Sequence, residues 1–196
     1  VRNTYHKYIV VEMRNDMIDL LSDYCKKIEL DITDTQLQQF DDYFRFLVEK
    51  NKVMNLTTII EKEDVVLKHF IDSIYIMKYT DFDEKKVIDI GTGAGFPGIP
   101  LAIMNPQTSF VLLDSLNKRI NFLNEVCNLC NLSNVITIHG RAEEISRKEE
   151  YREKFDYVVS RAVANMSTLL EYCTPFLKVG GQFISYKSGK VEEELS

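Results

Sequence analysis

A glycine-rich stretch in the middle of the chain places the strongest constraint on the fold. Residues 89–98 read DIGTGAGFPG and include the end of an apolar run that is typical of a buried strand. Glycine has no Cβ, so the backbone can turn sharply here and approach a ligand closely. Pro97 and Pro100 suit the first turn of a helix, where a missing N–H costs nothing. The stretch therefore predicts a strand, a tight loop and a helix whose N-terminus faces a ligand.

The rest of the chain after residue 86 repeats this alternation of strand and helix. Short runs rich in β-branched and aromatic residues are separated by segments with helical spacing, most clearly over 118–129. Such alternation is typical of a parallel, doubly wound sheet. We expect a Rossmann-like α/β fold with five strands, at 87–90, 109–113, 135–139, 155–159 and 182–186.

The first part of the chain has a different pattern. Apolar residues recur at spacings of three and four over 13–28 and again over 37–48, which predicts two amphipathic helices. Thr35 and Gln38 have the spacing of a capping box at the start of the second helix. A third helix is predicted over 65–79. We therefore expect a helical lobe over 1–85, followed by a sheet domain over 86–196.

Composition and charge exclude several classes of protein. Hydrophobic residues make up 45% of the chain and charged residues 28%, which are ordinary values for a globular domain. The longest uncharged apolar run, 98–104, is too short to cross a bilayer, and the charged N-terminus does not resemble a signal peptide, so we expect a cytoplasmic protein. The net charge is −6, so any contact with RNA must use a local patch or a shaped target.

The cysteines and histidines do not indicate a metal site or a disulfide framework. Four cysteines are scattered through the chain, and the pair Cys127-x-x-Cys130 falls on a helical run without a second pair that could complete a zinc site. The three histidines also lack the spacing of metal ligands. We expect both cysteines to be packing residues, and His69 to be an ordinary histidine of a helix.

Two cofactors are compatible with the glycine pattern. Gly93-x-Gly95-x-x-Gly98 matches the fingerprint of dinucleotide-binding proteins, whereas Asp89-x-Gly91-x-Gly93-x-Gly95 matches the first motif of class I methyltransferases. Asp114, at the end of the second predicted strand, suits either ligand because both carry an adenosine ribose. After the third strand, the segment 140–144 offers a backbone amide and an acidic side chain that can form hydrogen bonds with the edge of an adenine.

Five ordered motifs resemble one family. The segment GTGAGFPGIP (91–100) is similar to the signature of the bacterial small-subunit rRNA guanine-N7 methyltransferases, also called the glucose-inhibited division protein B family. The later segments 112–119, 140–143 and 160–164 resemble that family's motifs in the same order. In the helical lobe, Asn55-Leu56-Thr57 and the segment 69–73 resemble it as well. The resemblance covers nearly the whole chain after roughly the first fifteen residues.

The resemblance implies a cofactor and a set of residues that hold it. The cofactor is S-adenosylmethionine, and its site is lined by Gly91, Gly93 and Phe96 of the glycine-rich loop. Asp114 binds the ribose hydroxyls, and Ala142 and Glu143 contact the adenine. Arg161 lies beside the cofactor. Each of three residues also has a purely structural alternative, in which Asp114 caps a helix, Phe96 belongs to the core, and Arg161 pairs with a surface acid.

The resemblance also implies the reaction, which is methylation of N7 of a guanine in the 16S rRNA of the small ribosomal subunit. Guanine N7 carries no proton, so no general base is expected. Lys118, Arg119 and Lys187 are the candidate RNA-binding residues. The alternatives left open are an NAD-dependent oxidoreductase and a module that binds adenosine ligands or RNA without turnover. We expect a monomer without membrane partners. Class I methyltransferases normally have seven strands, so we also expect the C-terminal strands to be missing.

Overall fold

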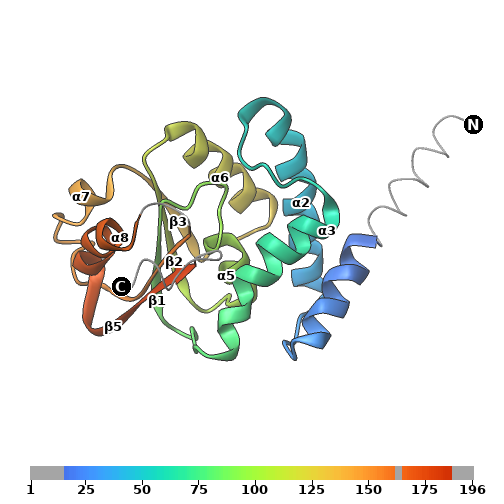
Figure 1. The fold of residues 1–196 in the computed structure, drawn as a ribbon, viewed down its shortest axis with the longest axis horizontal. Coiled ribbons are helices and arrows are strands. Elements are labelled where there is room, and N and C mark those ends of the chain that lie inside the picture. The colour runs from blue at the N-terminus through green and yellow to red at the C-terminus, as the bar shows by residue number, and fades with distance from the viewer. Residues whose placement is uncertain (1–15, 162–164, 187–196) are drawn as a thin grey trace, which may run out of the picture.

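The computed structural model describes residues 16–161 and 165–186 (Figure 1). They form one five-stranded sheet with the strand order β3-β2-β1-β4-β5, in which every neighbouring pair is parallel. The strands are β1 (Lys86–Ile90), β2 (Ser109–Asp114), β3 (Val135–His139), β4 (Phe155–Arg161) and β5 (Leu177–Tyr186). The expected α/β architecture and all five strands are confirmed. The main difference is that β5 begins five residues before the predicted start.

Helices cover both faces of the sheet. On one face lie α5 (Gly98–Met104) and α6 (Asn117–Leu129), and on the other lie α7 (Ala142–Ile145) and α8 (Met166–Cys173), as Figure 1 shows. The two faces bury different residues of the same strands, because successive side chains of a strand point to opposite sides. Leu112 packs in the core with Ile99 and Phe122, whereas its neighbour Leu113 packs with the α7 and α8 residues.

The N-terminal helices lie against the α5 and α6 face. Residues 16–27 are helical, and α2 (Asp34–Met54) follows. The predicted helix over 65–79 is broken into α3 (Lys62–Val65), a π-helix (Val66–Ile71), α4 (Asp72–Ile74) and a 3₁₀ turn (Tyr75–Lys78). Apolar spacing predicts helix here but does not distinguish a π-helix from an α-helix, because both keep one face buried.

The predicted capping box at Thr35 and Gln38 is wrong. The box is formed two residues earlier, where Thr33 Oγ1 accepts from Gln36 N at 3.3 Å and Gln36 Oε1 accepts from Thr33 N at 2.9 Å. Gln38 lies inside the helix and donates to Asp42 Oδ1 one turn later. Gln36 also donates to the backbone oxygens of Ile103 and Met104. The true box therefore joins the start of α2 to the end of α5, a contact that the sequence pattern does not reveal.

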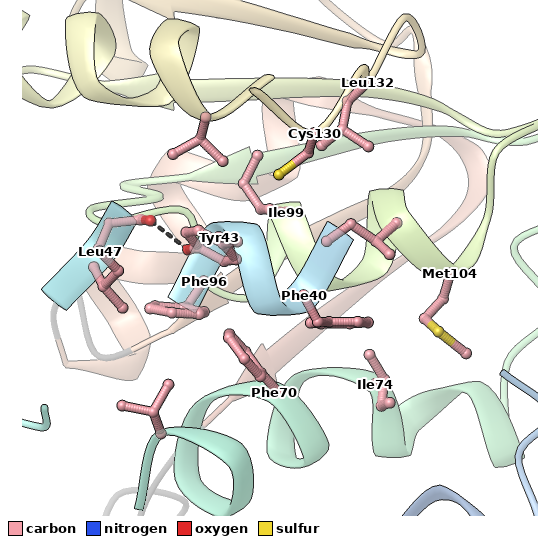
Figure 2. Close-up of a cluster of buried hydrophobic side chains, with 14 of the residues drawn as sticks. Phe40, Tyr43, Leu47, Phe70, Ile74, Phe96, Ile99, Met104, Cys130 and Leu132 are labelled. Carbon is pink, nitrogen blue, oxygen red and sulfur yellow. Dashed lines mark hydrogen bonds between the residues drawn. The ribbon is translucent and has the colours of Figure 1, made fainter. Parts of the chain in front are cut away.

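The helical segment and the sheet share one hydrophobic core. Phe40, Tyr43 and Leu47 recur along one face of α2 and are fully buried, and they belong to the same cluster as Phe70, Phe96 and Ile99 (Figure 2). The ring centroids of Phe40 and Phe70 lie 4.9 Å apart, and those of Tyr43 and Phe96 lie 5.4 Å apart. The division into domains at residue 86 stays a prediction.

Because Phe40 is fully buried at the centre of this cluster, we expect Phe40→Ala to lower the free energy of unfolding by about 3–5 kcal/mol. Val53→Ala on the same helix is the matched control, since Val53 is 79% exposed and its loss should change stability by no more than about 0.5 kcal/mol. Urea unfolding of the two variants and the wild type provides the comparison. Equal losses in both variants would contradict the shared core.

Candidate active site

The glycine-rich loop connects β1 to α5 at the carboxyl end of the sheet. The N–H groups of Gly91 and Thr92 both donate to Leu113 O, at 2.9 and 3.1 Å, which ties the loop to the neighbouring strand β2. Gly93 has a φ of +62°, and a Cβ built there would meet nothing closer than Gly91 O at 3.9 Å. At Gly95, with a φ of +103°, a Cβ would lie 2.6 Å from Ile99 Cγ1. Gly93 thus leaves backbone open to a ligand, whereas Gly95 permits close packing.

Asp89, the first residue of the motif, anchors the loop to the helix that follows it. Its side chain is fully buried, and Oδ2 accepts from Gly98 N at 2.9 Å at the start of α5. Burial raises the pKa of Asp89 to about 7, although the hydrogen bond from Gly98 acts in the opposite direction. The carboxyl group therefore fixes both ends of the loop from beneath.

Asp114, at the end of β2, anchors the loop from the other side. Its carboxylate is 2% exposed, and Oδ2 accepts from Gly93 N at 2.9 Å and from Arg119 Nη1 at 3.3 Å. Oδ1 accepts from Leu116 N at 2.9 Å, just before α6. Asp114 thus holds the turn before α6, but it does not cap the helix, whose N-cap is Leu116 without a side-chain cap. It also lines a cavity.

Two cavities meet at the carboxyl ends of β1 and β2. The larger, of about 380 Å³, extends over the glycine-rich loop, and the smaller, of about 150 Å³, extends toward α7 and α8. Gly91, Asp114 and Ser115 line both cavities, which are therefore contiguous. Open parallel sheets bind ligands at the carboxyl ends of their strands, beside the point where the strand order reverses, which here lies between β1 and β4.

The structure brings the predicted cofactor residues together. Gly93, Phe96 and Arg161 line the larger cavity, Ala142 and Glu143 line the smaller one, and Gly91 with Asp114 lies between them. Their roles as cofactor ligands stay predictions. Other residues that line the cavities were not predicted from the sequence, among them Leu56, Thr57, Ser115 and Tyr172. The motif Asn55-Leu56-Thr57 carried a signal for the first two, whereas no pattern pointed to Tyr172.

Phe96 and Arg161 each combine a structural contact with a place in the cavity wall. Phe96 belongs to the core, and its ring stacks on that of His69 with centroids 4.3 Å apart. The guanidinium carbon of Arg161 lies 4.9 Å from the centroid of the Phe96 ring. Arg161 also pairs with Asp72 at 3.2 Å, as the surface-acid alternative proposed. The pairing partner comes from the helical lobe, so the salt bridge joins that lobe to β4.

His69 lies in a helix, as expected, and its buried side chain also lines the larger cavity. Its Nε2 lies 2.9 Å from Thr57 Oγ1, and its Nδ1 lies 3.2 Å from Arg161 Nη2. Burial, together with the nearby Arg161 charge, lowers the pKa of His69 to about 4. The imidazole is therefore neutral at physiological pH.

The two candidate RNA-binding residues that the structure describes have different surroundings. Arg119 lines the larger cavity and is held by Asp114, whereas Lys118 is exposed on α6. Lys187 lies outside the described residues. The RNA-binding role of these three residues stays a prediction.

Within residues 16–161 and 165–186, no group of three or more His, Cys, Asp or Glu side chains could hold a metal ion. Burial raises the pKa of Cys127 to about 11 and that of Cys130 to about 12, as suits packing residues. No helix in these ranges is long and apolar enough to cross a membrane.

Solved structures share the fold of the chain. An SAM-dependent O-methyltransferase from Thermotoga maritima superposes with a TM-score of 0.52 and 19% identity, over 76% of this chain and 53% of that chain. A precorrin-6y C5,15-methyltransferase from Geobacter metallireducens superposes with a TM-score of 0.51 and 17% identity, over 68% of this chain and 64% of that one. At this identity the likeness shows the fold alone.

Sequence comparison gives closer relatives, all named ribosomal RNA small subunit methyltransferase G. The protein from Desulforamulus reducens is 50% identical over 182 residues, which cover 92% of this chain and 76% of the relative. The protein from Lachnoclostridium phytofermentans is 54% identical over 171 residues, covering 87% of this chain and 71% of the relative.

The family model that matches the chain is described as GidB, rRNA small subunit methyltransferase G, and it matches residues 36–196. This range contains the glycine-rich loop, Asp114 and every other residue that lines the two cavities. With a match over most of its length and relatives at about half identity, the chain belongs to the rRNA small subunit methyltransferase G family.

Proposed function

We propose that this protein transfers the methyl group of S-adenosylmethionine to N7 of a guanine in the 16S rRNA of the small ribosomal subunit. The observation that carries the proposal is the pair of contiguous cavities on the glycine-rich loop, in a chain of the rRNA small subunit methyltransferase G family. Family membership also decides between the two cofactors that the glycine pattern left open. It favours a methyltransferase over an NAD-dependent oxidoreductase.

The cavities fit the parts of S-adenosylmethionine. Ala142 and Glu143 of the smaller cavity would hold the adenine, and Asp114 at the junction would hold the ribose hydroxyls. The methionine part would lie over the loop, where the open backbone at Gly93 leaves room for it, with Arg161 beside it. When bound, the cofactor supplies an electrophilic methyl group on a positively charged sulfur.

The residues around the cavity act on this reaction by alignment. Guanine N7 attacks through a lone pair and releases no proton, so a general base has nothing to remove. Holding the two reactants in line lowers the barrier by removing their freedom to move apart. Positive charge passes from sulfur to the guanine, and the carboxylate of Asp114 and the loop carbonyls supply negative potential nearby.

Charge also bears on the form of the substrate. With a net charge of −6, the protein gains little from non-specific attraction to RNA, so shape must contribute much of the recognition. We propose that the protein acts as a monomer in the cytoplasm, on a folded small subunit or its precursor that presents an accessible guanine.

Labelled methyl transfer to unmodified small subunits tests the function directly. We expect incorporation into 16S rRNA at a guanine, detected by chemical cleavage specific for N7-methylguanine. A short naked oligonucleotide with the same guanine should react poorly, because it lacks the shaped surface. Efficient turnover on the oligonucleotide would contradict the proposed substrate form, and label at another atom would contradict the proposed reaction.

Asp114→Ala should weaken binding of S-adenosylmethionine by about 2–3 kcal/mol, because it removes charge-assisted hydrogen bonds to the ribose and one support of the loop. Isothermal calorimetry measures the affinity. Asp83→Asn, an exposed acid before β1, is the control and should bind like the wild type. Unchanged affinity in Asp114→Ala would remove Asp114 from the cofactor site.

The single-turnover rate with saturating cofactor should not change with pH from neutral to mildly alkaline conditions, because neither guanine N7 nor His69 exchanges a proton there. The pKa of His69 falls from 6.5 to about 4 on folding. Its contribution to stability is therefore present above about pH 6.5 and is lost as the pH falls toward 4. A rate that rises with the titration of one enzyme group, and that loses this dependence when His69 is replaced, would show the base that this mechanism lacks.

A further inference from the structure

The π-helix over Val66–Ile71 redirects one backbone carbonyl toward β4. In an α-helix the N–H of Asp72 would donate to Lys68 O, four residues earlier. Here it donates to Leu67 O and His69 O instead. Lys68 O accepts from Arg161 Nη1 at 3.1 Å. The irregular turn thus presents a backbone acceptor to a side chain of the cofactor cavity, and π-turns are frequent at functional sites.

Arg161 is held by the helical lobe at three points, which are not equivalent. Its salt bridge with Asp72 is the weakest anchor, because Asp72 is 53% exposed and surface ion pairs contribute little. The contact with His69 Nδ1 is more sheltered than the other two, since the Arg161 side chain is 16% exposed and His69 is 9% exposed. The contact with His69 depends on which ring nitrogen carries the proton.

The contacts around His69 assign this proton. A guanidinium can only donate, so the 3.2 Å contact with Arg161 Nη2 requires an unprotonated Nδ1. The proton then lies on Nε2, which donates to Thr57 Oγ1 at 2.9 Å. Thr57 Oγ1 also accepts from Ile59 N at 3.1 Å. Lys68 O also lies 3.2 Å from Nδ1, and with Nδ1 unprotonated both atoms act as acceptors for the same guanidinium, Lys68 O from Nη1 and Nδ1 from Nη2.

Thr57 is itself fixed in place by the end of α2. Asn51 Oδ1 accepts from Leu56 N and from Thr57 N, at 2.6 and 2.9 Å, and Asn51 Nδ2 donates to Thr57 O at 2.9 Å. These three hydrogen bonds hold the loop after α2 against the cavity, which Leu56 and Thr57 both line. A chain of hydrogen bonds therefore runs from Asn51 through Thr57 and His69 to Arg161.

We propose that Thr57 and His69 are positioning residues, which orient the Arg161 guanidinium toward an oxygen acceptor of the bound cofactor. Arg161 has five N–H donors, of which Nη1 uses two and Nη2 uses one on the lobe. The Nε–H and the second Nη2–H have no partner among the described residues and are available to the ligand. The inference rests on the proposed function, because it requires a cofactor beside Arg161.

Matched variants separate the acceptor at Nδ1 from the bulk of the ring. His69→Phe keeps an aromatic ring to stack on Phe96 but removes the acceptor, whereas His69→Asn keeps an oxygen acceptor near the position of Nδ1. Thr57→Val removes the hydroxyl with little change in shape, and Thr57→Ser restores it. Thermal unfolding of each variant, compared with the wild type, shows that the fold is retained.

Three measurements test the positioning role. Nitrogen NMR of labelled histidine should show the Nε2–H tautomer for His69 in the wild type and a mixture in Thr57→Val. Calorimetry with S-adenosylhomocysteine should show affinity about tenfold weaker in His69→Phe, and affinity within about threefold of the wild type in His69→Asn and Thr57→Ser. Single-turnover methyl transfer should fall in His69→Phe by the same factor at every pH, as a positioning role requires.

Two results would overturn the inference. One is wild-type affinity and rate in both His69→Phe and Thr57→Val, and the other is an equal loss in His69→Phe and His69→Asn, which would show that the acceptor is irrelevant. The proposed function fails separately, if the wild type does not methylate small subunits. The tautomer and the affinity for S-adenosylhomocysteine then still decide the positioning role, because neither measurement requires turnover.

Discussion

The glycine-rich loop depends on support from beneath by a buried tyrosine of the N-terminal helices. Tyr43 of α2 donates to Ala94 O within the loop, and its ring packs against Phe70 and Phe96 (Figure 2). Full burial raises the pKa of Tyr43 well above its usual value, so the phenol keeps its proton and remains a donor. A loop whose glycines leave its backbone open to a ligand is thereby held rigid on its other side.

Two buried carboxyl groups beside the glycine-rich loop have different roles. Asp89 is sealed beneath the loop, and burial raises its pKa to about 7. Asp114 is also buried, yet it receives N–H donors from Gly93, Leu116 and Arg119 and lies in the wall of both cavities. Asp89 therefore serves the loop, whereas Asp114 is placed to serve both the loop and a ligand.

The helical lobe contributes to the site as well as to the core. Its π-helix carries Lys68 and His69, and its loop after α2 carries Leu56 and Thr57, so that one wall of the larger cavity comes from the lobe. A cavity wall of this kind is consistent with catalysis by alignment. When no proton is transferred, the rate depends on how firmly the surrounding residues hold the cofactor and the guanine in position. The contact between Arg161 and the lobe joins the sheet to that wall.

The amino-acid sequence is sufficient to predict the class of fold and the place of the site. Alternating apolar runs indicated the five strands, and the glycines after β1 with Asp114 after β2 located the ligand edge, because parallel strands end at one edge of a sheet. The tertiary structure alone decided the capping box at Thr33, the π-helix at 66–71, and the meeting of Thr57, His69 and Arg161. Local spacing reports which face of an element is buried. It does not predict that two residues 92 positions apart, such as His69 and Arg161, will form a hydrogen bond, because that depends on how the elements pack together.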